Sequence, residues 1–209
     1  MIPVVPAEEP VDFDVKVRKK GEAWFLRKGI DTTVPLPEKT QLHPYWQDWC
    51  LEELHVAYGG ICAYLCVYVE SVIGGRTVDH YLPKKSRPDL AYEWSNYRLA
   101  CDTMNTRKGE ATDVLDPFTL THQRFRLDLL SGAISPTGKA EEVSYQAAQA
   151  TLLRLKLDDE KCRELRRNFY LEYRQGHMSE DFLKRNAPFV YQEVVRQGKL
   201  QGASGSIGT

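Results

Sequence analysis

The chain has 209 residues, of which 28 are basic and 29 acidic, so its formal charge is -1. This balance excludes a uniformly basic protein that coats nucleic acid, and any anionic partner must meet a local patch of charge. A hydrophobic fraction of 42%, with 11% aromatic residues, excludes wholesale disorder and suits one folded unit. No apolar run approaches the length of a membrane span, and no signal peptide is visible, so we expect a cytoplasmic protein without membrane contact.

The first 40 residues contain five of the eleven prolines. Between these prolines, Asp12 to Lys20 alternates apolar and charged residues, which is the period of a half-buried strand. We therefore interpret residues 1–43 as an extended N-terminal arm. Its composition favours docking on a partner over burial for four aromatic residues in and just after it: Trp24, Phe25, Trp46 and Trp49.

Helical and strand-like patterns follow the arm. Residues 44–57 have the apolar spacing of a helix, ended by a glycine pair. Two strand-like runs, 66–73 and 77–82, flank Gly74 and Gly75 and predict a hairpin. A helix is expected from about Trp94 to Asn105.

The rest of the chain is predicted to be a strand followed by helices. Residues 124–134 read as the strand, and the helices are expected over 139–155, 158–173 and 179–197. The overall expectation is an α+β chain that is mostly helical. Its parts would be the arm, a core over 44–136, a helical region over 137–200 and a disordered tail over 201–209.

The residues that point to chemistry lie in the middle of the chain. Asp79 and His80 are adjacent near the end of a strand, so their side chains leave it on opposite faces. About 25 residues later Asn105 can return an amide oxygen to a cation held by Asp79. A hard divalent ion accepts carboxylate and amide oxygens and keeps its other positions for water and phosphate. This pattern suits a single-metal phosphodiesterase.

The order Asp79-His80, then Asn96, then Asn105, followed by Thr-Arg-Lys-Gly, resembles the HNH endonucleases with their ββα-metal fold. The resemblance implies that His80 is the general base and that Asp79 and Asn105 hold the metal. Asn96 would steady the loop and orient His80. Mg²⁺ is the implied ion, with Mn²⁺ or Ni²⁺ as substitutes.

A longer string extends the likeness over roughly residues 60–170. It includes DHYLPKKSRPDLAYEWSNYRLACDTMNTRKG and LDPF, and it resembles the HNH nuclease subunits of Septu-type and retron-associated antiphage defence systems. That resemblance implies a partner, an ABC-type ATPase subunit. The chain itself has no Gly-x-x-x-x-Gly-Lys-Ser/Thr loop, so nucleotide hydrolysis is not expected to be its own activity.

Basic residues flank the proposed site, and we interpret them as contacts to a DNA or RNA backbone rather than only a solvated face. They are Lys84, Lys85, Arg87, Arg107 and Lys108.

Nucleases of this kind often carry two Cys-x-x-Cys pairs around a structural zinc. Here Leu65 stands where the second thiolate of the first pair would fall, and Met104 stands at the second position of the other. A thioether is a poor zinc ligand, so a closed structural Zn²⁺ site is not expected. Three cysteines remain as a possible degenerate site: Cys62, Cys66 and Cys101.

Three functions stay open on the sequence. The first is a metal-dependent endonuclease acting as the effector of a defence complex. The second is a catalytically weak module that binds nucleic acid or a partner, and the third is a structural adaptor. The sequence shows no element that reads bases, so neither the nucleic acid nor its sequence is indicated.

Overall fold

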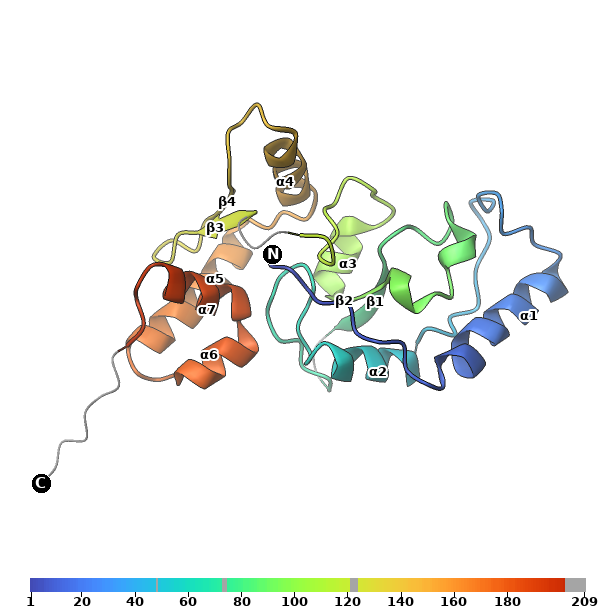
Figure 1. Ribbon diagram of the computed structural model, residues 1–209, viewed down its shortest axis with the longest axis horizontal. Coiled ribbons are helices and arrows are strands. Elements are labelled where there is room, and N and C mark those ends of the chain that lie inside the picture. Colours follow the sequence, from blue (N-terminus) through green and yellow to red (C-terminus); the bar gives the residue numbers. More distant parts are fainter. Residues whose placement is uncertain (48, 73–74, 121–123, 202–209) are drawn as a thin grey trace, which may run out of the picture.

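The computed structural model describes residues 1–47, 49–72, 75–120 and 124–201. The predicted α+β class is confirmed, because helices surround two small antiparallel sheets of two strands each (Figure 1). Among the described residues, no helix is long and apolar enough to cross a membrane.

The N-terminal region is helical where a strand was expected. A π-helical turn, Asp14–Arg18, leads into α1, Lys19–Lys28. Phe13 and Val17 are four residues apart and fully buried, whereas Val15, which an alternating strand would also bury, is 62% exposed. The helical period therefore outweighed the alternation on which the strand prediction depended.

Aromatic residues of this region pack into the chain's own core, so the docking interpretation is wrong for those that are buried. These are Trp24, Phe25 and Trp46, while Trp49 is half-buried beside Lys16. Helix α2, Trp49–Ala57, begins later than predicted, and residue 48 lies outside the described residues.

The hairpin pairs different segments from those predicted. Strand β1, Arg76–His80, pairs antiparallel with β2, Tyr97–Cys101, and helix α3, Asp102–Lys108, follows at once. Residues 66–72 are not a strand, and the expected turn includes residues 73 and 74, which lie outside the described part. The loop between the strands carries two 3₁₀ turns, Pro88–Leu90 and Trp94–Asn96.

Strand β2 and helix α3 replace the single helix expected over 94–105. Residues 97–100 are buried on both faces of the strand, so they lack the alternation that marks a half-buried strand. Tyr97 and Leu99 face one hydrophobic cluster, whereas Ala100 faces another. A short segment of this kind, in which the charged Arg98 is buried as well, is ambiguous between helix and strand until its partner is known.

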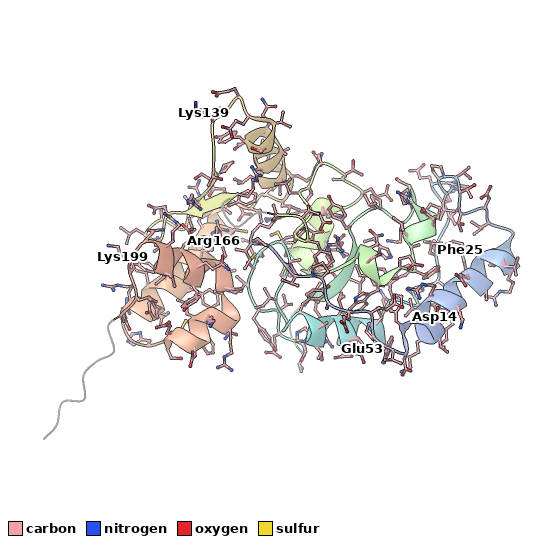
Figure 2. The ribbon with its side chains drawn as sticks, viewed as in Figure 1. Asp14, Phe25, Glu53, Lys139, Arg166 and Lys199 are labelled. Atoms are coloured by element: carbon pink, nitrogen blue, oxygen red, sulfur yellow. The ribbon has the colours of Figure 1, made fainter. Side chains whose placement is uncertain are left out.

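The hairpin thus separates two cores. One core combines the arm, α1 and α2 with one face of the hairpin; the other combines the other face with the C-terminal helices. In Figure 2, Asp14 and Phe25 mark the end of the molecule that contains the first core, and Arg166 and Lys199 mark the opposite end. Met1 is buried in the second core, and the backbone N–H of Val4 donates to the carbonyl of Pro117, so the arm runs over both.

The C-terminal half adds a second hairpin, of β3, Phe125–Leu127, and β4, Ile134–Pro136. Gly132 closes its turn at φ +72°, where a Cβ would lie 2.0 Å from the carbonyl oxygen of Arg163. This part of the sheet therefore requires glycine at that position.

In the described part of the chain, four helices follow β4: α4, Val143–Arg154; α5, Glu160–Arg174; α6, Glu180–Asn186; and α7, Pro188–Arg196. The predicted caps are confirmed, since Asp159 accepts from the Cys162 N–H and Ser179 accepts from the Phe182 N–H. The helix expected over 179–197 is divided at Ala187, because Pro188 cannot continue it. Residues 202–209 of the predicted tail lie outside the described part.

Candidate active site

A cavity of about 180 Å³ lies where the end of β1 meets α3. Asp79, His80 and Asn105 all line it, together with Lys84 from the loop after β1. The three residues predicted from the sequence as general base and metal ligands therefore line one cavity.

Asp79 is only 2% exposed and is held on both carboxylate oxygens. The Lys108 ammonium lies 3.0 Å from Oδ1, and the hydroxyl of Tyr64 donates to Oδ2. Burial raises the pKa of Asp79, and the Lys108 charge and the Tyr64 hydrogen bond oppose that rise.

His80 leaves β1 on the other face, as the strand period requires, and is 5% exposed. Its Nε2 lies 2.9 Å from the carbonyl oxygen of Ala91, and its ring packs edge-on against Trp46 and Tyr97. Burial, with the nearby charge of Lys84, lowers the pKa of His80 to about 3, so the ring is neutral at physiological pH.

The Ala91 contact decides which nitrogen of His80 carries the proton. A carbonyl oxygen only accepts hydrogen bonds, so Nε2 must be the protonated nitrogen of the neutral ring. Nδ1 then keeps its lone pair, and it makes no hydrogen bond to any described residue. A neutral imidazole with one free nitrogen is the form that a general base requires.

Asn96 holds the loop that supplies the Ala91 carbonyl. Its Oδ1 accepts from the Leu82 N–H at 2.8 Å, and its Nδ2 donates to the carbonyls of Leu82 and Leu90 at 3.0 and 3.2 Å. The Tyr97 hydroxyl donates to the same Ala91 carbonyl that contacts His80. Asn96 does not line the cavity, and its contacts suit the orienting role predicted for it.

Asn105 lies on α3 and is half-buried. Its Nδ2 donates to Thr77 Oγ1 at 3.0 Å, while its amide oxygen has no hydrogen bond to a described residue. Because the nitrogen is the atom in use, the oxygen is the atom left to face a cation. With the Asp79 carboxylate this gives two hard oxygen donors, which fits Mg²⁺, an ion that proteins bind by one or two such groups with water and phosphate.

The described residues contain no group of three or more His, Cys, Asp or Glu side chains suited to a metal. A cation in this cavity would thus depend on Asp79, Asn105 and oxygens from water or substrate, with Glu110 as a further carboxylate in the lining. Lys108 already holds one side of the Asp79 carboxylate, so it and a divalent ion would repel each other.

Lys108 and Arg107 are not the surface phosphate contacts that the sequence suggested. Lys108 is 2% exposed and binds Asp79 and the carbonyl of His80. Arg107 donates to Asp159 at 2.5 Å and to the carbonyl of Leu155 at 3.0 Å. Both side chains are committed within the chain, because α3 packs against β1 and lies beside the start of α5.

The other three basic residues lie at or near the surface. Arg87 pairs with Asp89, and Lys85 donates to the carbonyl of Glu38. Lys84 lines the cavity and has no ion pair with a described residue. It is the residue of this group best placed to meet a phosphate.

Two of the three cysteines proposed as a degenerate zinc site meet. The sulfurs of Cys62 and Cys101 lie 3.8 Å apart, whereas Cys66 accepts instead from the backbone N–H of Ile2. All five cysteines of the chain are free thiols.

No pattern in the sequence indicated that Tyr64 is the second partner of Asp79. For Lys108 a signal existed: it lies three residues after Asn105, so both residues are on the same face of α3. Its position was interpreted as phosphate binding, and burial revealed its actual partner.

A comparison of the chain with protein-family models gives no match, and neither does a comparison with curated proteins.

Proposed function

We propose that the chain is a metal-dependent endonuclease of the HNH type, which hydrolyses phosphodiester bonds of DNA or RNA. The observation that supports this most directly is the shared cavity. Asp79 and His80 line it from β1 and Asn105 lines it from α3, the helix that follows β2, and His80 keeps Nδ1 free.

In this proposal each side chain has one task. His80 removes a proton from the attacking water through Nδ1, a form of catalysis that contributes about 10²–10⁴-fold. The Ala91 carbonyl fixes the ring, and Asn96 fixes the loop that carries it. Lys84 faces the phosphate from the rim of the cavity.

Asp79 and Asn105 would hold a divalent cation, Mg²⁺ or a substitute such as Mn²⁺ or Ni²⁺. When bound, such an ion stabilises negative charge that grows on phosphate oxygens.

The biological setting proposed is the cytoplasmic effector subunit of an antiphage complex with an ABC-type ATPase. It rests on the sequence resemblance alone. Copurification of the chain with the ATPase encoded beside it tests this part independently of cleavage.

The experiment for the activity is incubation of the purified chain with plasmid DNA or tRNA, with Mg²⁺ or Mn²⁺ and with the metal chelated. Wild type should cut in the presence of metal, and His80→Ala should not, while both bind the substrate equally. His177→Ala is the matched control, because His177 is an exposed histidine paired with Glu172 and it does not line the cavity. Cutting by His80→Ala at the wild-type rate contradicts the proposal.

One observation favours a second candidate, a binding module of weak or no activity. Lys108 is fully buried against Asp79 and supplies a positive charge on the carboxylate that a divalent ion would use. If neither wild type nor His80→Ala cuts, and both bind nucleic acid or the partner equally, this second function replaces the first.

A further inference from the structure

Two thiols from distant parts of the chain meet at the junction of β2 and α3. The Cys62 thiol donates to the sulfur of Cys101 across 3.8 Å, although the residues are 39 positions apart. Cys62 is fully buried, whereas Cys101 is half-buried at the end of β2. Because all five cysteines are described, this pair can be compared with the other three.

Hydrogen bonds make the two sulfurs chemically different. The backbone N–H groups of Leu65 and Cys101 donate to Cys62, at 3.4 and 3.3 Å. The thiol of Cys62 and the Met104 N–H donate to Cys101, and together they lower the pKa of Cys101 to about 7. Burial raises the pKa of Cys62, so near neutral pH a substantial fraction of Cys101 is thiolate, whereas Cys62 stays a thiol.

The other three cysteines lack this arrangement. Each is buried, and burial raises the pKa of Cys50 to about 12 and also raises the pKa of Cys66 and of Cys162. Arg107 donates to Cys162 and the Ile2 N–H donates to Cys66, but burial is the larger effect on both thiols. Thiols held in the protonated form react slowly, so these three act as small apolar side chains.

We propose that Cys62 and Cys101 form an oxidisable dithiol, which a hydroperoxide converts into an intrachain disulfide. The sulfur of Cys101 attacks the peroxide, the O–O bond breaks, and one oxygen stays on sulfur as a sulfenic acid while the other leaves as water or alcohol. The sulfur of Cys62 then attacks Cys101, the S–O bond breaks, and the hydroxyl leaves as water with the proton of Cys62. The two sulfurs lose two electrons in total, and the peroxide gains them.

The position of the bond gives it a structural consequence. To form the bond, the two sulfurs must approach from 3.8 Å to about 2.05 Å. The disulfide would link the turn between Ile61 and Tyr68, two residues joined by a β-bridge, to Cys101 at the end of β2, directly before α3. This modification does not depend on the proposed nuclease function.

The test is treatment of the full chain with stoichiometric hydrogen peroxide, followed by alkylation, proteolysis and mass spectrometry. We expect a peptide cross-linked between Cys62 and Cys101 that is lost on reduction, and a higher melting temperature of the oxidised chain. Before oxidation, iodoacetamide at neutral pH should label Cys101 at least about tenfold faster than the other four cysteines.

Two variants separate this outcome from nonspecific oxidation. Cys162→Ser should form the same cross-link, because Cys162 is not part of the pair. Cys62→Ser keeps a hydroxyl that can donate to Cys101 but cannot form a disulfide, so it should leave Cys101 as a sulfenic acid that dimedone captures. Accumulation of sulfinic acid on Cys101 in the wild type, a cross-link from Cys101 to Cys162, or a stoichiometric zinc ion that blocks oxidation would overturn the proposal.

Discussion

The ammonium of Lys108 lies 3.0 Å from Oδ1 of Asp79, and neither side chain is more than 2% exposed. When a pair is buried this deeply, removing one partner leaves the other charge buried without compensation, which strongly destabilises the folded state. The pair also links α3 to β1 at the edge of the proposed reaction centre, so one contact affects both stability and cation binding.

Lys108→Met should destabilise the fold by about 3–5 kcal/mol, because it leaves the Asp79 carboxylate buried without a counter-charge. Urea unfolding at pH 7 measures this loss. Lys16→Met is the matched control: it removes an exposed pair with Asp12 and should cost no more than about 1 kcal/mol. The double variant Lys108→Met, Asp79→Leu should recover part of the loss, and a double variant less stable than Lys108→Met would refute the explanation.

Lys108→Gln should bind Mn²⁺ at least about tenfold more tightly than the wild type, because it removes a positive charge from beside the proposed ligand Asp79. Electron paramagnetic resonance of free Mn²⁺ reports this affinity without any substrate. Lys16→Gln removes an exposed charge that pairs with Asp12 and does not line the cavity, so it should bind like the wild type. Weaker binding by Lys108→Gln would show instead that the ammonium supports the cation site.

Two helix caps and the grouping of the candidate site residues were predictable from the sequence, since both depend on local signals. The caps at Asp159 and Ser179 were predicted from residue type and position and are found. The grouping of Asp79, His80 and Asn105 followed from a short motif, and the three line one cavity.

Pairing and burial were not predictable, because they depend on distant residues. The partner of β1 is β2, which starts 17 positions after β1 ends, and its two-sided burial hid the strand period. In the sequence Lys108 resembles an exposed surface lysine. Only the folded chain shows that Tyr64 and Lys108 both bind the Asp79 carboxylate.

The buried imidazole of His80 should make folding sensitive to acid. Its pKa is about 3 in the folded chain against an ordinary value of 6.5, so between these values the unfolded chain binds the extra proton. Stability is therefore lost as the pH falls below 6.5. From pH 7 to pH 5 the wild type should lose about 2 kcal/mol more than His80→Gln.

Urea unfolding of both proteins at pH 5, 7 and 8 checks this expectation. Between pH 7 and 8 the ring is neutral in both states, so the two proteins should change in parallel there. Equal losses for the wild type and His80→Gln between pH 7 and pH 5 would show that His80 gains a proton in the folded chain near its ordinary pKa.

Asn96→Ala should reduce both stability and the proposed cleavage. It removes three hydrogen bonds to Leu82 and Leu90 and leaves their backbone groups without these partners, at a cost of about 2–4 kcal/mol. The loop that presents the Ala91 carbonyl then loses its anchor, so the His80 ring is no longer held in one orientation. Asn96→Asp is the matched variant: it keeps an oxygen for the Leu82 N–H, but it turns a buried carboxylate oxygen toward the carbonyls of Leu82 and Leu90. We expect its unfolding free energy to be no higher than that of Asn96→Ala, with kcat reduced and KM little changed in both variants. An Asn96→Ala protein that cuts at the wild-type rate would show that the His80 ring is positioned without this loop.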